Sequence, residues 1–491
     1  MRVALINPRN IDTPNHPLGL LYIAAALEKE GHIIKIFDQE MDITPAKFAK
    51  EIMMWMPEIV GLTSTTPQFE LGLKIASEIK LLSNTIPVVF GGAHPSVCPA
   101  EVIANDSVDF VVIGEGENIM ANLCRCVQNG GDLNNVKSIG YKKSGQLIFT
   151  QREPLIENLD TIPFPARHLL SSYWYFAPPR IRGVWTKSLI TVMASRGCPY
   201  RCIWCSSHTI FGRKVRFRSP ANIMEEILQA RKDFNIDSVY FVDDTFTVNI
   251  QWVETICELF KKRELKGIKW ACQARVNTVT AAILKKMKAA GCVQLDFGVE
   301  SGSQRVLNIL KKDITIEQTK LAFRRTKEAG IKAFASVIVG TPGETKEDVM
   351  MTYQLLKELK PDYTEIFYAT PYPGTRLYEI ANELKVFNNN PIVYDNWYVS
   401  KQIDNPVMSV GFSKNELIKL RSMLENQVIW RNYLTLFGDL TSILRVFQIL
   451  NLGFLGLFNG FKRFISTGKI DSISVEVLRY YRKKTKSLFY K

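Results

Sequence analysis

Short apolar runs alternate with amphipathic helical segments in two separate parts of the chain, and no other feature constrains the fold as strongly. In the first part, the predicted strands lie at residues 3–7, 33–37, 59–63, 88–90 and 110–113. In the second part, six predicted strands begin near residues 189, 239, 270, 294, 333 and 363. Strands that are joined by helices pair in parallel, and helices then cover both faces of the sheet. The sequence therefore predicts an α/β protein with a doubly wound, Rossmann-like parallel sheet, followed by a partial (βα)6, TIM-like barrel.

These patterns divide the 491 residues into four parts. We expect the first sheet in residues 1–142, a proline-containing linker in 143–187, the barrel in 188–385 and a mostly helical region in 386–491. The first residues match a buried strand and not the apolar segment of a secretory leader. A cytoplasmic location is the corresponding prediction.

The net charge of +14 is concentrated near the end of the chain, where residues 411–491 hold 14 Lys and Arg against 5 Asp and Glu. Because the main body is only mildly basic, no nucleic-acid partner is expected. The apolar run 446–461 is flanked by basic residues and is shorter than a membrane span, so it is either a buried helix pair or an interfacial segment. The basic run 482–486 favours anionic lipid, and we therefore predict peripheral membrane contact through the C-terminal region.

Three closely spaced cysteines, Cys198, Cys202 and Cys205, follow the first barrel strand with the spacing C-x3-C-x2-C. Three thiolates can hold three irons of a 4Fe-4S cluster and leave the fourth iron open to a ligand. A zinc site completed by His208 and three inert thiols are the alternatives, although zinc usually takes paired C-x2-C spacings. Nine cysteines in a chain of this length are too few for a disulfide scaffold.

This cysteine run, with Gly197 before it and the aromatic Trp204 before the last cysteine, resembles the cluster motif of the radical SAM superfamily. The resemblance implies a 4Fe-4S cluster whose open iron chelates S-adenosylmethionine (SAM), with Cys198, Cys202 and Cys205 as the catalytic cluster ligands. Polar groups collect at the carboxyl ends of the barrel strands, where barrel active sites lie. Besides Trp204, the expected SAM contacts are Asp243 and Asp244 at the ammonium group, Gln273 and Arg275 at the carboxylate or ribose, Glu300 and Ser301 at the ribose, and Gly340 and Pro342 at the adenine. Taken singly, each of these residues could equally be a capped strand end with a solvated charge.

Glycines and small hydroxyl residues mark the strand ends of the first domain, where open α/β sheets bind ligands and where glycine lets a ligand approach the backbone. The block resembles the cobalamin-binding domain at the N-terminus of many radical SAM enzymes. The resemblance implies cobalamin contacts at Asn7, Pro17, Leu18, Gly19, Ser64, Thr65, Gly91, Gly92, His94, Gly114, Glu115, Gly116 and Glu117. The chain lacks the Asp-x-His-x-x-Gly loop that supplies a histidine to cobalt, so His16 and His94 are interpreted as loop or packing histidines. The lower axial ligand of cobalt is left open.

Residues 1–400 together resemble the class B radical SAM methyltransferases and the anaerobic magnesium-protoporphyrin IX monomethyl ester cyclases. The resemblance implies cleavage of SAM to a 5′-deoxyadenosyl radical, followed by cobalamin-dependent methyl transfer to an unactivated carbon of a lipid-like, tetrapyrrole or natural-product substrate. It also implies an external electron donor of the flavodoxin or ferredoxin type and an anaerobic setting. Cyclisation or carbon–carbon bond formation without methyl transfer is one alternative, and a non-catalytic cobalamin- or metal-binding regulator is another.

Overall fold

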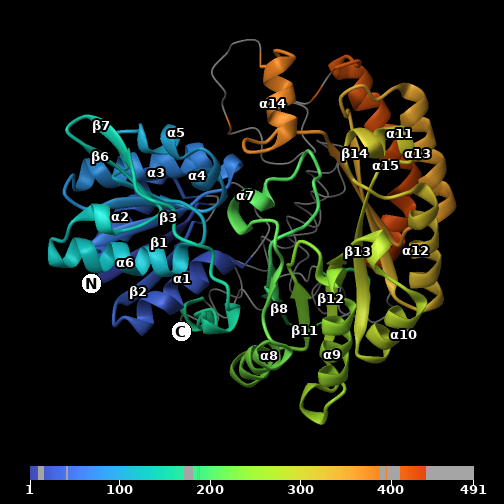
Figure 1. The fold of residues 1–491 in the computed structure, drawn as a ribbon, viewed down its shortest axis with the longest axis horizontal. Helices are drawn as coiled ribbons and strands as arrows, with labels where there is room; N and C mark the ends of the chain where they lie inside the picture. The colour runs from blue at the N-terminus through green and yellow to red at the C-terminus, as the bar shows by residue number, and fades with distance from the viewer. Residues whose placement is uncertain are drawn as a thin grey trace, which may run out of the picture.

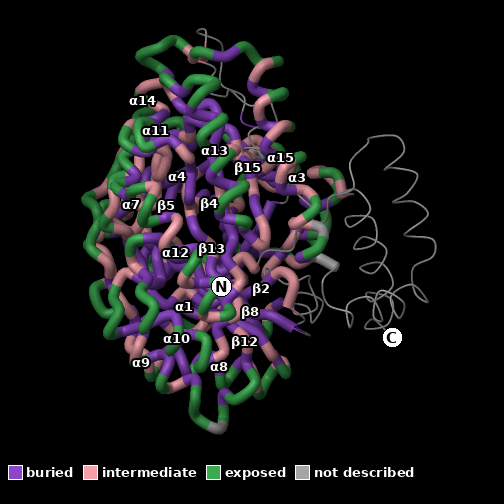
Figure 2. Tube along the Cα trace, turned by 90° about the vertical axis from the view of Figure 1, so that its right-hand side faces the viewer, coloured by how far each residue is buried: buried purple, intermediate pink, exposed green. Residues whose placement is uncertain are grey.

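The computed structural model describes residues 1–8, 16–39, 43–170, 181–184, 186, 188–387, 394, 408 and 410–437. It contains two α/β units that lie side by side, the N-terminal one on the left of Figure 1 and the later one on the right. Buried segments occupy the interior of the molecule and exposed segments its periphery (Figure 2). The predicted α/β class with two successive sheets is confirmed.

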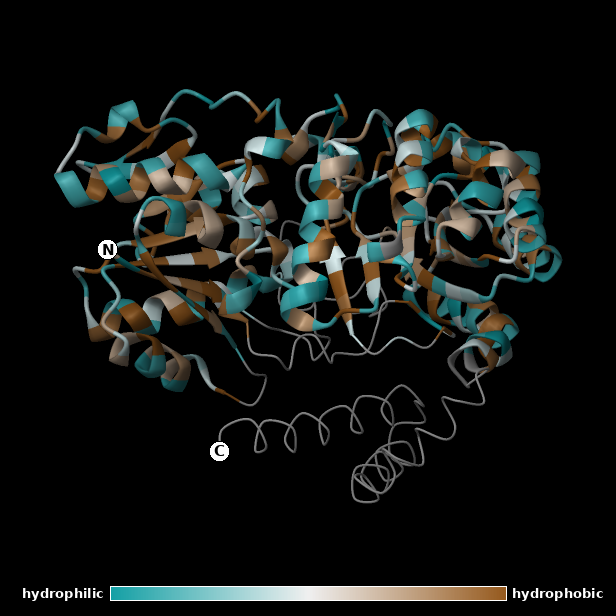
Figure 3. Cartoon of the chain, turned by 90° about the horizontal axis from the view of Figure 1, so that it is seen from below, coloured by the Kyte–Doolittle hydropathy of each residue, from teal (hydrophilic) through white to brown (hydrophobic). Residues whose placement is uncertain are grey.

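The first sheet has seven strands in the order β2-β1-β3-β4-β5-β6-β7. These strands are β1 (Arg2–Asn7), β2 (Ile33–Asp38), β3 (Ile59–Thr63), β4 (Val88–Gly91), β5 (Phe110–Val112), β6 (Ile139–Lys143) and β7 (Gln146–Phe149). The first five pair in parallel, as the alternation of strands and helices predicts. Hydrophobic residues are concentrated on the strands and hydrophilic residues on the outer helix faces (Figure 3).

Helices cover both faces of this sheet: α1 (Leu18–Lys29), α2 (Pro45–Met54), α3 (Phe69–Leu82), α4 (Ala93–Val97), α5 (Pro99–Ile103) and α6 (Gly116–Asn129). Alternate residues of β1 enter different cores because successive side chains of a strand point to opposite faces. Val3 and Leu5 pack with α1 and α6. Ala4 and Ile6 pack on the other face with α2, α3 and α5. The two faces of the sheet are therefore both covered by helices.

The last two strands are antiparallel and were not predicted from the sequence. A two-residue turn joins them, with Ser144 at φ 51° and Gly145 at φ 78°, the left-handed conformations of a type I′ hairpin turn. Strand β7 lies beyond residue 142, where we placed the end of the first domain, and it pairs along its length with β6. The sheet therefore continues into the predicted linker. This hairpin has little local signal in the sequence, because its strands are short, mix polar with apolar residues, and are partly exposed.

The second sheet is the predicted six-stranded open barrel, with all strands parallel in the order β15-β14-β13-β12-β11-β8. Its strands are β8 (Leu189–Val192), β11 (Ser238–Phe241), β12 (Lys269–Ala274), β13 (Cys292–Glu300), β14 (Lys332–Val339) and β15 (Tyr363–Tyr368). The helices around it are α8 (Pro220–Phe234), α9 (Ile250–Phe260), α10 (Ala281–Ala289), α11 (Gln304–Ile309), α12 (Ile316–Glu328), α13 (Lys346–Leu359) and α14 (Arg376–Glu383).

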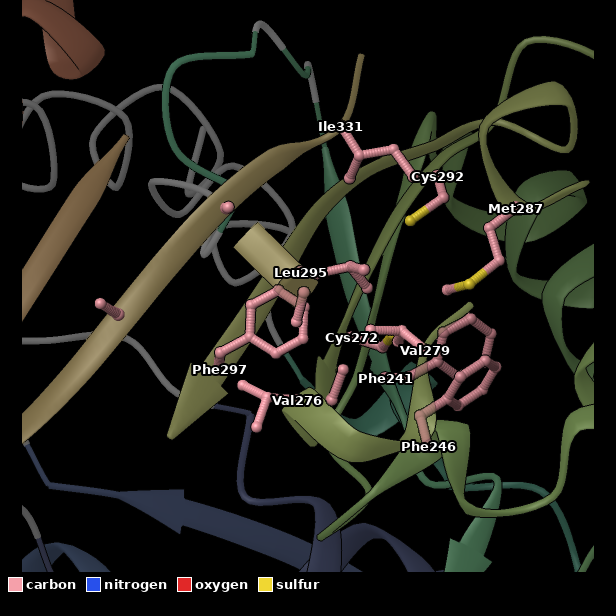
Figure 4. Close-up of a cluster of buried hydrophobic side chains, with 14 of the residues drawn as sticks. Phe241, Phe246, Cys272, Val276, Val279, Met287, Cys292, Leu295, Phe297 and Ile331 are labelled. Atoms are coloured by element: carbon pink, nitrogen blue, oxygen red, sulfur yellow. The ribbon is translucent and has the colours of Figure 1, made fainter. Parts of the chain in front are cut away.

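One large hydrophobic cluster fills the space between the barrel strands and the helices outside them. Figure 4 shows part of it, where Phe241 and Phe246 lie against Cys272, with Leu295 and Phe297 on the neighbouring strand. The rings of Phe241 and Phe246 are 4.5 Å apart between centroids. These aliphatic and aromatic contacts hold the strand ends, which carry the polar groups, in fixed positions.

Helix α15 (Lys414–Phe437) covers the open edge of the barrel, packing against β15 and β14. The sequence predicts this helix at residues 414–432, and it is confirmed with a slightly longer span. Within the described residues, no helix is both long and apolar enough to cross a membrane. The apolar run 446–461 and the basic run 482–486 lie outside the described residues.

Candidate active site

The three motif cysteines lie on one closed loop, residues 197–215, which we call the cluster loop. Its two ends are strands β9 (Ser195–Arg196) and β10 (Arg216–Phe217), which pair antiparallel. Gly197 has φ 99°, and a Cβ there would lie 2.3 Å from the carbonyl oxygen of Lys214, so only glycine fits this close approach. The amide of Cys198 donates to the carbonyl of Gly212 at 3.3 Å. The loop is therefore closed at its base.

All three cysteines are free, half-buried thiols. Burial raises the pKa of Cys198, and the nearby negative charges of Asp244 and Cys202 raise it further. Burial also raises the pKa of Cys205 to about 11, with Asp244 and the other two thiols adding to the effect. All three thiols lie on this one short loop, where the amide of Cys205 donates to the carbonyl of Cys202 at 3.3 Å, and bound metal would stabilise their thiolate forms. The site therefore fits an iron–sulfur cluster held by Cys198, Cys202 and Cys205.

Arg275, at the end of β12, lies beside this group. Its Nη1 is 3.8 Å from Cys202 Sγ, and its guanidinium stacks on Tyr200 with 3.7 Å between Cζ and the ring centroid. Its Nε and Nη2 are buried and have no hydrogen-bond partner among the described residues. A buried cation with unused donors fits the carboxylate of a ligand, as we expect for SAM at this residue.

Glu300 and Trp204 meet through Lys312, a residue that the sequence analysis missed. Lys312 Nζ donates to Glu300 Oε1 at 2.6 Å and lies 5.3 Å from the Trp204 ring centroid. Glu300 has φ 62°, at the bulged end of β13. Gly298 leaves room for this pair, because a Cβ at its position would lie 2.2 Å from Glu300 Oε1 and would displace that side chain. A lysine twelve residues after Glu300 gives no local signal of this contact.

The two adjacent aspartates predicted to bind SAM have different surroundings. Asp243 is buried and accepts from the amide of Ala194 at 3.2 Å and from Ser195 Oγ at 2.5 Å. Burial raises the pKa of Asp243 to about 7. Asp244 is exposed, accepts from Ser207 Oγ, and acts electrostatically on Cys198 and Cys205. Asp244 thus lies at the cluster loop, whereas Asp243 holds the end of β8.

Of the remaining predicted SAM contacts, Ser301 is turned into the core and Gln273 is exposed. Ser301 is fully buried, with its Oγ 3.3 Å from Thr352 Oγ1. Gln273 lies near the end of β12 with its side chain exposed. Gly340 has φ 86°, and its amide donates to Glu344 Oε2 at 2.6 Å. This bond closes the turn that contains the half-buried Pro342.

The carboxyl edge of the first sheet faces the cluster loop. Helix α4, which follows β4, lies beside α7 (Ser207–Phe211) of the cluster loop, and α7 is drawn between the two units in Figure 1. Gly374, after the last barrel strand, lies so close to α4 that a Cβ there would be 2.6 Å from Val97. The strand ends of the two sheets, predicted to hold different cofactors, are therefore brought together.

The predicted cobalamin contacts at this edge are mainly backbone and small side chains. Gly92 has φ 99°, and a Cβ there would lie 2.9 Å from the carbonyl of Ser64, so glycine is needed where the β3 and β4 loops meet. Ser96 Oγ donates to the Gly92 carbonyl at 2.7 Å and accepts from the Gly114 amide at 3.0 Å. The loops after β3, β4 and β5 thus form one connected glycine-rich surface that a large ligand can approach.

Seven further predicted cobalamin contacts belong to the strand ends and helix starts of the first domain. Asn7 Nδ2 donates to Asp38 Oδ1 at 2.8 Å, and Thr65 pairs with Gln68 in a capping box. Leu18 is buried. Pro17 is half-buried at the start of α1, and the exposed Gly19 has open space around its Cα. Gly91 is the last residue of β4, and Gly116 is the first residue of α6.

The His94 imidazole does not lie on that surface. It is fully buried, with its centroid 4.3 Å from that of Phe69 and 4.9 Å from that of Tyr394. Its Nδ1 is 3.3 Å from Thr66 Oγ1. Burial lowers the pKa of His94 to about 4, so the ring is neutral at pH 7. This placement agrees with the interpretation of His94 as a packing histidine.

Glu115 and Glu117 do not point into open space at the sheet edge but bind arginines at the base of the cluster loop. Glu115 Oε1 is 2.9 Å from Arg196 Nη1. Glu115 Oε2 is 2.9 Å from Arg216 Nη1. Arg196 also pairs with Glu117. All four side chains are buried. We call this set the interdomain network. The sequence shows each residue, but the pairing spans about a hundred positions and has no local signal.

Comparisons with known proteins agree with this division of the chain. Residues 6–124 match the family model of the B12 binding domain, and residues 192–356 match that of the radical SAM superfamily. The chain is 36% identical over 430 residues to an uncharacterized methyltransferase of Pyrococcus horikoshii, covering 86% of this chain and 90% of that protein. It is 31% identical to the anaerobic magnesium-protoporphyrin IX monomethyl ester cyclase of Rubrivivax gelatinosus, covering 76% and 67%.

Two solved structures share the fold. The cobalamin-dependent S-adenosylmethionine radical enzyme OxsB, with aqua-cobalamin and S-adenosylmethionine bound, superposes with a TM-score of 0.67 at 18% identity, covering 99% of this chain and 71% of that one. The radical S-adenosylmethionine methyltransferase TsrM from Kitasatospora setae, with tryptophan and a SAM analogue bound, gives a TM-score of 0.64 at 22% identity, covering 78% and 76%. At these identities, the likeness concerns the arrangement of the two sheets.

Proposed function

Because the chain belongs to the radical SAM enzymes that carry an N-terminal B12-binding domain, we propose that it transfers a methyl group to an unactivated carbon of a small, lipid-like or tetrapyrrole substrate. The cofactors of this enzyme are a 4Fe-4S cluster, SAM and cobalamin. When bound, they supply a 5′-deoxyadenosyl radical and a transferable methyl group. The observation that carries the proposal is the meeting of the two carboxyl edges at the cluster loop, because methyl transfer needs both cofactors at one substrate.

The protein's own contribution is position and charge. Cys198, Cys202 and Cys205 would hold the cluster on a loop closed at its base by Gly197. The unpartnered donors of Arg275 would bind the SAM carboxylate. Asp244, exposed at the same loop, would face the SAM ammonium group.

The Glu300–Lys312 pair would support Trp204 beside the cluster and offer a carboxylate to the ribose hydroxyls. Glycines after β4 and β5 would let cobalamin approach the edge of the first sheet. No step needs a general acid–base pair, which fits a chain with only five histidines. An external reductant of the flavodoxin or ferredoxin type completes the proposal, since the cluster must be reduced for each turnover.

Oxidative ring formation is a second candidate, and the cyclase of Rubrivivax gelatinosus is the relative that favours it. Methyl transfer is favoured by the Pyrococcus horikoshii relative, which is named a methyltransferase. The alignment with this chain covers 90% of that protein. The cytidylyl-2-hydroxyethylphosphonate methyltransferase of Streptomyces wedmorensis, 26% identical over 433 residues, supports it further.

The test is anaerobic reconstitution of the full chain with iron, sulfide and cobalamin, followed by SAM and a chemical reductant. We expect 5′-deoxyadenosine, together with S-adenosylhomocysteine from methylation of reduced cobalamin. The Cys198→Ala variant should lose 5′-deoxyadenosine, and Cys126→Ser, outside the cluster loop, should retain it. Absence of both products from the loaded wild-type enzyme would refute the proposal. Formation of 5′-deoxyadenosine without S-adenosylhomocysteine would support ring formation instead.

The substrate class can be narrowed by mass spectrometry of lipid and tetrapyrrole extracts incubated with the enzyme and SAM labelled in its methyl group. A mass increase of one labelled methyl in a single compound class is the expected result. Sedimentation with anionic vesicles, comparing the full chain with a chain ending at residue 437, tests the proposed membrane contact. Equal sedimentation of the two would contradict that contact.

A further inference from the structure

Three side chains with metal-binding atoms converge at the corner between α4 and α5, and none of them belongs to the cluster loop. They are His94, Cys98 and Glu101, with the spacing H-x3-C-x2-E. The ligand atoms of the three all lie within 4.8 Å of one another. The corner packs against α3 through Phe69 and against Tyr394 from the C-terminal region. No step of the proposed methyl transfer uses these side chains.

The orientation of His94 is the observation that distinguishes this corner from a chance cluster. Its side chain is fully buried, and its Nδ1 is 3.3 Å from Thr66 Oγ1. Its Nε2 is buried, has no hydrogen-bond partner among the described residues, and lies 4.0 Å from Glu101 Oε2. A buried ring nitrogen without a partner is costly. An imidazole held by a hydrogen bond at one nitrogen presents the lone pair of the other, as in most histidine metal ligands.

The other two groups complete a mixed donor set with a supported carboxylate. Cys98 is a free, half-buried thiol. Tyr394 donates its hydroxyl proton to Glu101 Oε2 at 3.3 Å, which orients the carboxylate in the way that outer-shell partners orient metal ligands. The Glu101 side chain is 43% exposed, so a metal ion can reach the corner from solvent.

From this geometry we propose that His94 Nε2, Cys98 Sγ and a Glu101 carboxylate oxygen bind one Zn²⁺ ion, with water at the fourth coordination position. Sulfur, imidazole nitrogen and carboxylate oxygen together suit zinc, whereas Mg²⁺ and Ca²⁺ prefer oxygen alone. With zinc–ligand bonds of about 2.0–2.3 Å, the three atoms need to approach by roughly 1 Å through side-chain rotation. Through Tyr394, the ion would fix part of the C-terminal region against the corner below the Gly92 loop.

The experiment uses full-length protein in which Cys198, Cys202 and Cys205 are all replaced by Ala, so that the cluster thiols cannot bind the probe metals. The probes are Co²⁺ and Zn²⁺ alone. We expect one equivalent of Co²⁺ to produce a thiolate-to-cobalt charge-transfer band, and one equivalent of Zn²⁺ to abolish it. Adding Cys98→Ser or His94→Gln should remove the band. Adding Cys126→Ser, a half-buried cysteine on α6, should leave it unchanged.

A second measurement tests the zinc site if the triple cysteine variant does not fold. Zinc content is measured in the wild-type enzyme and in the Cys98→Ser variant. Both proteins are produced in zinc-supplemented medium and are loaded with the 4Fe-4S cluster. We expect about one zinc per chain in the wild type, and its loss in the variant at unchanged iron content. The proposal fails if the band persists without Cys98, if no band forms in folded protein, or if zinc content is equal in the two cluster-loaded enzymes. Because the readouts are metal binding, they are independent of methyl transfer.

Discussion

Two buried networks of carboxylates and arginines secure the start of the barrel, and they differ in what they connect. In the interdomain network, Glu115 and Glu117 of the first domain bind Arg196 and Arg216, which flank the cluster loop. The second set, which we call the barrel network, is centred on Glu226 of α8, which binds Arg167 of the linker and Arg218 after β10.

The barrel network lies mainly within the linker and the barrel, although Arg218 Nη1 also donates to Tyr22 Oη of α1 at 3.5 Å. Arg167 Nη2 also donates to the carbonyl of Thr191 at 2.8 Å, and Arg218 Nη1 to that of Met193 at 3.2 Å, so Glu226 secures the end of β8. In contrast, the interdomain network continues to the glycine-rich edge, because Glu115 follows Gly114, which is bonded through Ser96 to Gly92. Similar chemistry therefore fixes the end of β8 in the first case and joins the first domain to the base of the cluster loop in the second.

The largest expected effect is a loss of the protein's folding stability when the barrel network is broken. Glu226→Ala leaves two buried guanidinium groups without their carboxylate, and we expect the free energy of unfolding to fall by about 3–5 kcal/mol. Denaturant unfolding of the cobalamin-free protein, followed by circular dichroism, measures this change. A loss below about 1 kcal/mol would contradict a buried role for this network.

The second-largest expected effect is on the ratio of the two reaction products, and it is expected when the interdomain network is altered. In the double variant Glu115→Gln, Glu117→Gln, the first domain is less firmly held at the cluster loop, and a shift of about 1 Å can cost on the order of a hundredfold in rate. We expect the ratio of S-adenosylhomocysteine to 5′-deoxyadenosine to fall about tenfold or more. The magnetic interaction between the reduced cluster and cob(II)alamin, measured by electron paramagnetic resonance, should weaken as well.

Glu226→Gln is the matched control for that variant. It alters a carboxylate of equal burial but should leave the product ratio and the magnetic interaction at wild-type values in the folded fraction. If both variants change the product ratio equally, the two networks do not differ in their effect on the cluster loop and the first domain.

The pH dependence of stability sharpens the comparison further. Although burial acts in the opposite direction, Arg216 and Arg196 lower the pKa of Glu115, and Arg167 and Arg218 lower that of Glu226. A carboxylate with a folded pKa below its unfolded value of 4.5 stabilises the fold above that pH, and this stabilisation is lost as pH falls through the folded pKa. Wild-type stability should therefore decrease below about pH 4.5, and less steeply in Glu226→Gln. Parallel curves for the two proteins would contradict the assignment.

The smallest effect is expected at an exposed ion pair. Arg376 pairs with Glu379 and Glu383 on the surface of α14. Because solvent screens such pairs, Arg376→Ala should change neither the unfolding midpoint nor the product ratio measurably. A loss of stability comparable to that of Glu226→Ala would show that burial does not separate these sites.

The parts of the molecule that could be predicted are those with local signals. The strands and helices follow from periodicity, and the barrel has all six predicted strands. The hairpin of β6 and β7 was missed because its strands are short and mix polar with apolar residues. Among the predicted SAM contacts, Arg275 and Asp244 lie beside the cluster-loop cysteines, whereas Ser301 and Asp243 are buried and hydrogen-bonded to neighbouring residues, a difference that adjacency in the sequence could not reveal.

By itself, the sequence determined the two α/β units and the cysteine loop, because hydrophobic periodicity and ligand spacing act over a few residues. Only the tertiary structure decided which charges meet. Glu115 and Arg196 are 81 positions apart, and Lys312 reaches Trp204 across the mouth of the barrel. Burial makes such pairs specific, since an unpaired charge in the interior is costly, and burial depends on how the whole chain packs. The same reason separates His94, enclosed by Phe69 and Tyr394, from the strand-end surface where its position in the sequence suggested it would lie.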